Sequence, residues 1–316
     1  MVRQTLKFHA AWPIEIMTVE MKKMNTDALT QAVIDRFAQT PDPRLKTIMG
    51  ALVKHLHAFA REVQLTEEEW FKGIEFLTST GQKCHDQRQE FILLSDVLGL
   101  SILTVALNND KPEACTQATV FGPFYVKDAP HYQNGDDVSN GASGQACLVR
   151  GKVFGLQGEA IPNALIEVWQ ADDEGFYDVQ KAGLDHAQAR GFLHSREDGS
   201  FDFKSIVAEA YPIPVDGPVG QLLCATNRSP WRPAHLHFMI TAPGYETLIT
   251  HVFRQGDAYL EADPVFGVRE SLIADWVSHE DGPTTLDFNF VLNPVTQMPS
   301  AVAMQSPTHH LNGAQQ

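Results

Sequence analysis

The chain has 316 residues, 43% hydrophobic and 20% charged, a composition that predicts a folded globular protein of one large or two modest domains. Its formal net charge of -15 argues against binding to nucleic acid or to an anionic membrane surface, because both need basic patches. Four cysteines, scattered without zinc-knuckle or disulfide spacing, are expected to be reduced packing residues: Cys84, Cys115, Cys147 and Cys224.

The N-terminal part of the chain is predicted to be helical. An apolar patch near the start is interrupted by Pro13 and Glu15, well short of a secretory signal, which favours a cytoplasmic protein. Further along, apolar residues recur at spacings of three and four and therefore share one face of an amphipathic helix. These residues are Leu45, Ile48, Met49, Leu52, Leu56, Phe59 and Val63.

Two more helices are expected after this one. Thr66 and Glu69 have the spacing of a capping box, which predicts the start of a helix through Trp70. Residues 87–107 predict a third helix, and residues 91–107 within it form the longest apolar run. Because this run holds Ser95 and Asp96, we interpret it as a buried helix and not as a membrane span, which needs about 20 apolar residues.

From about residue 145 the pattern changes to short β-branched runs separated by Gly, Pro, Asn and Asp. Strands are expected over residues 147–153, 164–169, 201–203, 235–241, 248–253 and 285–292. Their density indicates an antiparallel β-sandwich with long loops between the strands. The sequence therefore predicts an α+β fold, in which a helical domain precedes an antiparallel β-sandwich domain.

The most informative motif is the pair His235 and His237, two residues apart in one of these strands. Such residues project from the same face, roughly 6.5 to 7 Å apart, so both imidazoles can reach one metal ion. The pair His55 and His57 lies on a predicted helix instead, where residues two apart point about 200° apart and cannot converge. We therefore expect a metal at His235 and His237 and surface positions for the other pair.

Tyr177 and Tyr211 are candidates to complete this metal site. Both lie in predicted loops, and two phenolates with two imidazoles form a hard donor set that suits ferric iron better than zinc. A bound cation also deprotonates its tyrosine ligands, so no further base is needed. Taken singly, each tyrosine has the alternative interpretation of an ordinary amphipathic loop residue.

Five segments of the chain occur in the order and spacing of a known family. They are residues 122–125 (Gly-Pro-Phe-Tyr), 164–172, 175–177 (Gly-Phe-Tyr), 211–220 and 232–237 (Arg-Pro-Ala-His-Leu-His). In these segments the chain resembles the intradiol ring-cleavage dioxygenases, over about residues 25–295. Segments 120–124 and 213–215 are more similar to members that cleave hydroxyquinol than to members that cleave catechol.

The resemblance implies a division of the chain into four parts. Residues 1–24 would be a flexible extension, with Met24 as an alternative start. Residues 25–120 would form a helical domain through which two copies pair as a homodimer, with a phospholipid at the dimer interface. Residues 121–295 would form the catalytic β-sandwich, and residues 296–316 a mobile tail.

The resemblance also implies an activity. Tyr177, Tyr211, His235 and His237 would hold one Fe(III) per subunit. With O2, the enzyme would cleave hydroxyquinol (1,2,4-trihydroxybenzene) between its two adjacent hydroxylated carbons, giving 3-hydroxy-cis,cis-muconate. Tyr211 would in addition take a proton from the substrate, and Arg232 would stabilise negative charge on the ring. The alternative interpretation of Arg232 is a salt bridge at the rim of the site.

A substrate pocket follows from the same resemblance. Leu93 and Asp96 are three apart and share a helix face, and Asp96 would accept a hydrogen bond from a third hydroxyl. His251 replaces the glutamine of catechol-cleaving relatives, and it either contacts the third hydroxyl or packs within its strand. The remaining pocket residues are Val120, Phe121, Gly122, Pro123, Phe124, Ile213, Pro214 and Val215.

Other functions remain as alternatives. The enzyme would instead be a catechol or chlorocatechol 1,2-dioxygenase if the pocket favoured those diols, since single ring substituents differ by only about 1 to 3 kcal/mol. A transthyretin-like β-sandwich that binds without catalysis is the non-enzymatic alternative. A cupin is excluded by spacing, because it needs a carboxylate ligand soon after the second histidine and Glu246 lies too far from His237.

Overall fold

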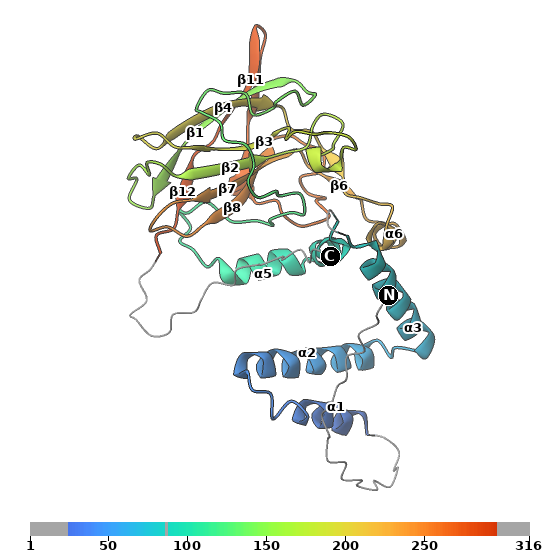
Figure 1. Cartoon of the computed structure of the whole chain (residues 1–316). Coiled ribbons are helices and arrows are strands. Elements are labelled where there is room, and N and C mark those ends of the chain that lie inside the picture. The colour runs from blue at the N-terminus through green and yellow to red at the C-terminus, as the bar shows by residue number, and fades with distance from the viewer. Residues whose placement is uncertain (1–24, 86–87, 296–316) are drawn as a thin grey trace, which may run out of the picture. The chain divides into compact units, whose positions relative to one another are not determined.

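The structure is a computed structural model that describes residues 25–85 and 88–295 (Figure 1). The expected extension and tail therefore lie outside the described residues. The chain divides into two compact units, Met1–Glu75 and Phe76–Gln316. Among the described residues, the first unit is helical and the second contains every strand.

The first unit contains α1 (Thr26–Asp35), α2 (Pro43–Glu62) and the beginning of α3 (Glu67–Lys83). The sequence did not predict α1, whose amide groups at the first turn are capped by Asn25. This helix packs on α2 through Thr30, whose hydroxyl lies 3.0 Å from Nδ1 of His57. Of the two expected surface histidines, His55 is exposed and His57 is half-buried by this contact.

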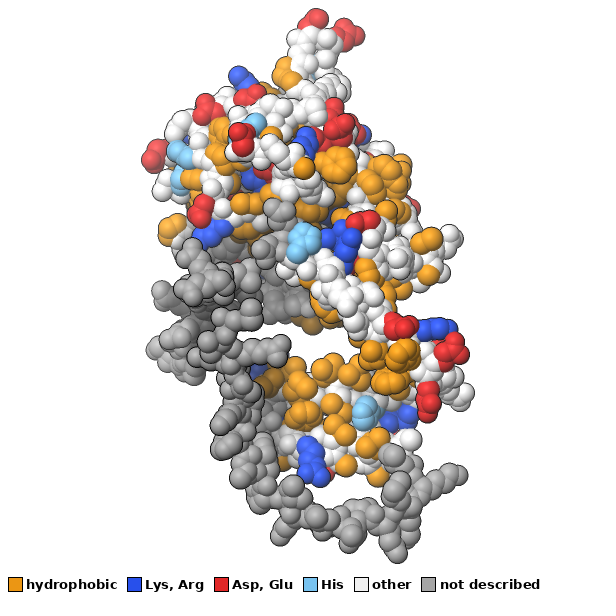
Figure 2. Space-filling view, turned by 45° about the vertical axis from the view of Figure 1, so that its right-hand side comes forward, with side chains coloured by type: hydrophobic (Ala, Val, Ile, Leu, Met, Phe, Trp, Pro, Cys, Tyr) orange, Lys and Arg blue, Asp and Glu red, His pale blue; other side chains and the backbone are white. Residues whose placement is uncertain are grey.

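The predicted apolar stripe of α2 is confirmed as one face of a helix, but it does not face α1. The Gly50 and His57 side of α2 contacts α1 instead. Six stripe residues remain between 46% and 55% exposed: Leu45, Ile48, Leu52, Leu56, Phe59 and Val63. Figure 2 shows hydrophobic side chains gathered on the surface of this helical unit. The stripe is therefore uncovered within the first unit.

The predicted capping box at the start of α3 is confirmed. The backbone N–H of Glu69 donates to Oγ1 of Thr66 over 3.2 Å, and the backbone N–H of Thr66 donates to Oε2 of Glu69 over 2.9 Å. The backbone N–H of each residue is thus hydrogen-bonded to the side chain of the other, as this motif requires.

The single helix predicted over residues 87–107 is wrong. The chain forms two helices, α4 (Glu90–Val97) and α5 (Leu100–Asn108), which meet at an angle of 77°. Gly99 lies between them with a φ of 72°, a left-handed conformation that ends α4 and that glycine adopts without strain. Within the described residues no single helix is long and apolar enough to span a membrane, and only the bent α4–α5 pair meets that length and composition.

Two five-stranded sheets form the body of the second unit (Figure 1). In one sheet, β1 (Ala146–Gly155) pairs with three strands, β4 (Ser200–Ile206), β11 (Gly282–Asp287) and β12 (Phe290–Leu292), and β10 (Trp276–His279) pairs with β11. The other sheet has the order β3 (Arg190–His194), β2 (Leu165–Trp169), β7 (His235–Thr241), β8 (Leu248–Arg254) and β9 (Ile273–Ala274).

The expectation of purely antiparallel sheets is wrong. β1 runs parallel to both β11 and β12, and β8 runs parallel to β9. The last strands return to β1 after a long connection and not through a hairpin, so nothing forces them to run antiparallel. Residue alternation within a strand carries no information on this direction, which is why the sequence pattern missed it.

The core lies where the two sheets pack on each other. Phe201, Phe238 and Phe290 are all fully buried there, and the rings of Phe238 and Phe290 are 4.7 Å apart. Phe238 comes from β7 and Phe290 from β12, so their contact joins the sheets. Because neighbouring residues of a strand face opposite sides, His235 and His237 on β7 point away from this core.

Candidate metal centre and active site

Four side chains meet at one point of the second unit. The Tyr177 hydroxyl oxygen lies 3.2 Å from that of Tyr211 and 2.9 Å from Nε2 of His237. Nε2 of His235 lies 3.2 Å from Nε2 of His237. All four residues are buried. The structure thus brings together all four predicted metal ligands, with two oxygens and two nitrogens directed at a common centre.

Hydrogen bonds fix how His235 faces this centre. Its Nδ1 lies 2.7 Å from the carbonyl oxygen of Pro233, and because a carbonyl can only accept, Nδ1 carries the proton. The lone pair of the neutral ring is therefore on Nε2, which points at the centre. The Nδ1 of His237 has no hydrogen-bond partner among the described residues, and its Nε2 faces the same centre.

Strand pairing places the two histidines. On one side of β7, Trp169 of β2 lies opposite His237 and stacks on its ring, with ring centroids 4.7 Å apart. On the other side, His251 of β8 lies opposite the same residue. Gly122, in the segment between α5 and β1, has a φ of 78°, and a Cβ there would lie only 3.0 Å from the His237 ring. Glycine is thus the residue that lets this loop close over the site.

A short loop after β2 delivers Tyr177. The carboxylate of Asp172 accepts hydrogen bonds from the backbone N–H groups of Glu174 and Phe176, which folds the loop back on itself. Gly175 has a φ of 83°, and a Cβ there would lie 2.7 Å from Cβ of Tyr211. The Gly-Phe-Tyr motif therefore needs its glycine so that the two tyrosines can approach each other.

A two-stranded ribbon delivers Tyr211 together with Arg232. Within it, β5 (Tyr211–Pro212) and β6 (Trp231–Arg232) pair so that Tyr211 lies opposite Arg232. Between the two strands, the chain forms α6 (Pro218–Ala225), a helix that the sequence did not predict and that has Pro218 in its first turn. Nη1 of Arg232 lies 3.1 Å from Nε2 of His235, so the guanidinium reaches the edge of the centre.

The electrostatics of the centre favour neutral imidazoles and a bound cation. Burial and the neighbouring Arg232 lower the pKa of His235 to about 3, and burial and His251 lower the pKa of His237 well below its usual range. Burial and the nearby Tyr211 hold the pKa of Tyr177 well above 10. Tyr177 therefore ionises only when a cation compensates its charge, and neutral imidazoles are the form that binds a metal.

Arg232 carries a permanent positive charge at this site. Burial alone would lower its pKa, but the Asp263 carboxylate beside it raises that pKa beyond the usual value. Asp263 itself is buried, and although burial would raise its pKa, the Arg232 guanidinium holds the pKa below its ordinary value. The two form a buried ion pair, so the rim salt bridge considered for Arg232 is not what the structure contains.

The donor set fits iron. Two phenol oxygens and two imidazole nitrogens suit a hard trivalent ion, and the unprotonated Nε2 of His235 points inward. Among the described residues, no group of three or more His, Cys, Asp or Glu side chains could hold a metal ion, which leaves this mixed tyrosine and histidine set as the candidate. Tyr177, Tyr211, His235 and His237 are the residues that would hold it.

Four of the predicted substrate-binding residues line one cleft of about 230 Å³: Leu93, Pro123, Phe124 and Pro214. The Phe124 ring stacks on Tyr177 with ring centroids 4.5 Å apart, which connects the cleft to the metal centre. Ile213 packs with Leu93 in a buried apolar cluster below the cleft wall. Arg190 holds this arrangement by donating to the Phe124 carbonyl and pairing with Asp178.

Asp96 is buried on α4, near the charged end of the site. Burial raises its pKa, and Ser101, Arg232 and Asp263 are the groups whose hydrogen bond or charge also acts on it. Val120 is buried as well and packs with Ile102 and Val265. The sequence did not identify Val265 or Asp263, since neither belongs to a recognisable motif and both lie far along the chain from their partners.

Three predicted pocket residues lie apart from the cleft. Phe121 packs on Tyr125 and Trp169 and is 38% exposed. Val215 is exposed and lines a separate cavity along α6. His251 is fully buried behind the two histidine ligands, with its ring centroid 4.0 Å from that of His237.

Burial and neighbouring basic side chains determine the charge state of His251. Burial, together with the neighbouring His235 and Arg232, lowers its pKa well below the usual range. The Val120 backbone counters this in part, although neither ring nitrogen meets hydrogen-bond geometry with any described residue. His251 is therefore neutral and packed against the rings of both ligands.

Comparisons with known proteins agree with this site. The family described as catechol dioxygenase N terminus matches residues 42–116, and the family described as dioxygenase matches residues 120–294. The chain belongs to the intradiol ring-cleavage dioxygenases, enzymes that use non-haem iron. The predicted α+β fold and family are thereby confirmed, with the correction that the sheets are mixed.

Within this family the chain is similar to hydroxyquinol 1,2-dioxygenases. It is 65% identical to the 6-chlorohydroxyquinol 1,2-dioxygenase of Cupriavidus pinatubonensis, over 87% of this chain and 99% of that protein. It is 52% identical to the hydroxyquinol 1,2-dioxygenase of Nocardioides simplex, over 81% of this chain and 87% of that protein. The solved structure of hydroxyquinol 1,2-dioxygenase from Pseudomonas putida superposes with a TM-score of 0.80 at 44% identity, covering 85% of this chain and 98% of that one.

Proposed function

We propose that this protein cleaves hydroxyquinol with O2 between its two adjacent hydroxylated carbons, giving 3-hydroxy-cis,cis-muconate. The observation that carries the proposal is the convergence of Tyr177, Tyr211, His235 and His237 on one buried centre. The printed names of relatives at 52% and 65% identity support hydroxyquinol as the substrate. The four converging donors speak against a transthyretin-like binding module.

The proposed cofactor is one Fe(III) per subunit, held by those four side chains. When bound, the iron supplies a Lewis-acid centre that withdraws electrons from the diol ring and prepares it for reaction with O2. Tyr211 accepts a proton from a substrate hydroxyl, since its oxygen lies at the centre and the substrate must lose protons there. Nη1 of Arg232 faces the same space and stabilises negative charge that develops on the ring.

The walls of the cleft select the substrate. Leu93, Pro123, Phe124 and Pro214 offer apolar contacts for the aromatic ring. The same cleft is also lined by polar residues, namely His85, Arg88, Gln89, Glu90 and Gln180. Asp96 offers the carboxyl group that distinguishes a third hydroxyl, because its buried position leaves it dependent on a polar partner. Val120, Gly122 and Ile213 are proposed to complete the walls, and His251 packs behind the proposed histidine ligands. Phe121 and Val215 lie apart from the cleft, so the structure gives them no direct part in this selection.

A second candidate substrate is a chlorinated hydroxyquinol. The relative at 65% identity is named for 6-chlorohydroxyquinol, and an apolar slot accepts chlorine at a small cost. A catechol or chlorocatechol is less well supported, because the catechol 1,2-dioxygenase of Candida albicans is 37% identical and the solved 3-chlorocatechol 1,2-dioxygenase of Rhodococcus opacus is 28% identical.

The proposed assembly is a homodimer through the helical unit. The uncovered apolar stripe of α2 is a surface that a second copy would cover, and hydrophobic faces of this kind are costly in water. A phospholipid held between the helices is a further part of this proposal, supported by the same apolar surface. A cytoplasmic location is supported by the four cysteines, all of which are free.

The test is the visible spectrum of the iron-loaded protein. Tyrosinate bound to ferric iron absorbs visible light, and anaerobic hydroxyquinol should shift that band. Admission of O2 should then release a product that carries both atoms of labelled O2. An iron-loaded protein that shows no visible band, or that consumes no O2 with hydroxyquinol, would contradict the proposal.

A further inference from the structure

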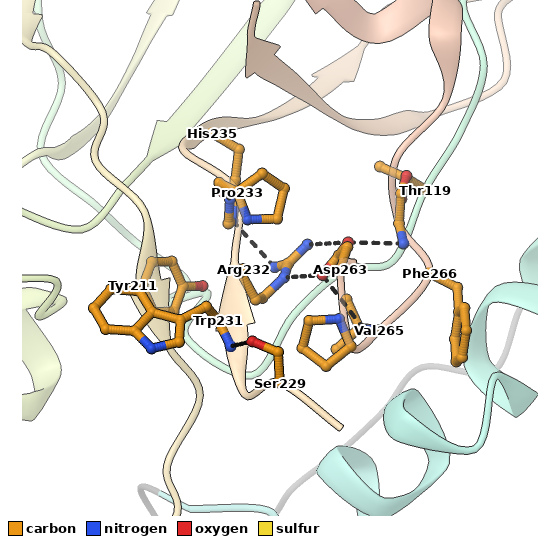
Figure 3. Close-up of polar contacts among 12 residues, drawn as sticks. Thr119, Tyr211, Ser229, Trp231, Arg232, Pro233, His235, Asp263, Val265 and Phe266 are labelled. Carbon is orange, nitrogen blue, oxygen red and sulfur yellow. Dashed lines mark hydrogen bonds and ion pairs between the residues drawn. The ribbon is translucent and has the colours of Figure 1, made fainter. Parts of the chain in front are cut away.

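Arg232 and Asp263 form a buried ion pair of defined geometry. Nε of Arg232 donates to Oδ1 of Asp263 over 3.1 Å, and Nη2 lies 3.4 Å from Oδ2. The third nitrogen, Nη1, faces His235 instead. Figure 3 shows the guanidinium between His235 on one side and Asp263 on the other. Two nitrogens are thus held by the carboxylate, and one is left for the metal centre.

The carboxylate of Asp263 is itself held in place by the turn that follows it. The backbone N–H of Gly267 donates to Oδ2 over 2.9 Å, and that of Val265 donates to Oδ1 over 3.4 Å. Phe266 has a φ of 56°, and its N–H donates to the Asp263 carbonyl, which closes the turn. Because both oxygens receive amide donors, the carboxylate cannot rotate freely to follow Arg232.

Two side chains from elsewhere fix this turn to the walls of the pocket. Thr119 donates its hydroxyl to the Gly267 carbonyl over 2.9 Å. Arg228 donates to the Pro264 carbonyl over 2.9 Å and to the Val97 carbonyl over 2.6 Å, and its guanidinium lies 5.1 Å from the centre of the Phe266 ring. Since Val97 ends α4, Arg228 links the turn to the helix that carries Asp96.

There is no spare room inside the turn. A Cβ at Gly267 would lie 3.1 Å from Oδ2 of Asp263, 3.1 Å from Oγ1 of Thr119 and 3.2 Å from Nη2 of Arg232. A larger residue would therefore push directly on the ion pair. An added Cβ would require these neighbours to shift by a few tenths of an ångström, so the ion pair packs closely on the backbone at residue 267.

We propose that Asp263 and the turn 263–267 are the positioning element for Arg232, which keeps Nη1 directed at the bound ring. The proposal rests on the proposed function, because Arg232 acts there on the substrate. A donor that is already oriented costs no reorganisation when charge develops, and this is what makes such a donor effective. Asp263 makes no hydrogen bond to the proposed metal ligands and does not line the cleft, so its hydrogen bonds reach the site through Arg232, although its charge also acts on Asp96 and His235.

The test is a double-mutant cycle on the iron-loaded enzyme, with Asp263→Asn, Arg232→Lys and the double variant. We expect Asp263→Asn to lower kcat for hydroxyquinol at least tenfold, with the visible band, the iron content and the anaerobic Kd for hydroxyquinol each within about threefold of wild type. The double variant should be no more than about threefold slower than Arg232→Lys, because either single change already loses the guanidinium nitrogen that Asp263 orients toward the centre.

Control variants separate positioning from stability. Asp287→Asn breaks the exposed Arg150–Asp287 pair on the far sheet and should leave kcat unchanged. Gly267→Ala keeps every charge and should still lower kcat at least tenfold by displacing the pair, which keeps the proposal testable if Asp263→Asn does not fold. A kcat for Asp263→Asn within tenfold of wild type would overturn the proposal. So would a double variant in which the two losses of kcat multiply, or a Gly267→Ala variant with wild-type kcat. Failure of the proposed function would look different from failure of this proposal, because the wild-type protein itself would then lack the visible band or the cleavage of hydroxyquinol.

Discussion

The hydroxyl oxygen of Tyr177 lies 2.9 Å from Nε2 of His237, although the two residues are 60 positions apart in the sequence. Tyr177 lies on a loop after β2 and His237 on β7, and their contact forms part of the proposed metal centre. A cation held at this point would take these two side chains as ligands in place of their hydrogen bond to each other.

Tyr177→Phe is therefore expected to lose iron. Residues that only hydrogen-bond to the ligands of a metal already contribute about 10- to 100-fold to metal affinity. Loss of a ligand itself should lower the affinity at least as much. Iron per chain and the visible absorption band are the measurements. Tyr245→Phe is the matched control, since the Tyr245 hydroxyl bonds only to Glu159 at the surface among the hydrogen bonds of the described residues. Full iron content in Tyr177→Phe would remove this tyrosine from the ligand set.

Asp96→Ala should lower activity on 1,2,4-trihydroxybenzene more than activity on catechol. Asp96 is buried near Arg232, and only the triol has a hydroxyl to place against it. Loss of a buried partner for a substrate hydroxyl costs about 1 to 3 kcal/mol, or roughly tenfold to a hundredfold in the ratio of kcat/KM values. Thr104→Ala, at an exposed position of α5 whose hydroxyl bonds to the Leu100 carbonyl, is the control. Equal losses on both substrates would refute this role.

The raised pKa of Asp96 predicts a pH-dependent cost in stability. A carboxyl whose pKa is higher in the folded than in the unfolded state favours folding below its unfolded pKa of about 3.8, and loses that contribution as pH rises. Asp96→Asn does not titrate at this position. Its free energy of unfolding should therefore increase relative to that of wild type as pH rises from 4 to 7. Urea unfolding at both values of pH measures this. A difference that stays constant with pH would show that the folded state leaves this carboxyl unperturbed.

His251→Gln tests the two interpretations of His251. If the ring contacts the third hydroxyl or a water beside it, the ratio of hydroxyquinol to catechol turnover should change by about tenfold. If the ring only packs behind His235 and His237, the ratio should stay the same and the iron site alone should weaken. The fully buried position and the lack of a good hydrogen bond from either nitrogen to the described residues favour the second result. Turnover of both diols and iron content are measured together.

Leu52→Glu should convert the proposed dimer into a monomer. The substitution places a charge in the middle of the uncovered stripe of α2, where a second copy would have to bury it. Lys54→Glu, an equally exposed position off the stripe, should leave the assembly unchanged. Sedimentation of the intact protein over a range of concentrations gives the answer. A Leu52→Glu variant that still sediments as wild type does would place the interface elsewhere.

Local chemistry determined which parts of this structure the sequence could predict. The capping box at Thr66 and Glu69 and the pair His235 and His237 depend on spacing alone, so both were predictable. The break at Gly99 was missed because a glycine within an apolar run is as compatible with a helix as with its end. The helix α6 was missed because its proline-rich start resembles a loop, although Pro218 in the first turn is a helix signal.

Long-range relationships were not accessible in the same way. The parallel pairing of β1 with β11 and β12 depends on how distant segments return, and the alternation within a strand does not encode it. Asp263 and Arg232 are 31 residues apart, and neither sequence position suggests the other. The chemistry of the side chains was enough to propose the metal-binding residues, but a residue such as Asp263, which pairs with Arg232 beside them, was found only in the structure.

The pairing of β1 also has a consequence for synthesis on the ribosome. β1 is made early in the second unit, yet two of its three neighbours are β11 and β12, which end at Leu292. Every residue proposed to hold iron has then already left the ribosome, while the sheet beneath still lacks its final strands. Contacts between such distant segments close slowly, so the core beneath the proposed metal centre is completed only after the C-terminal strands emerge.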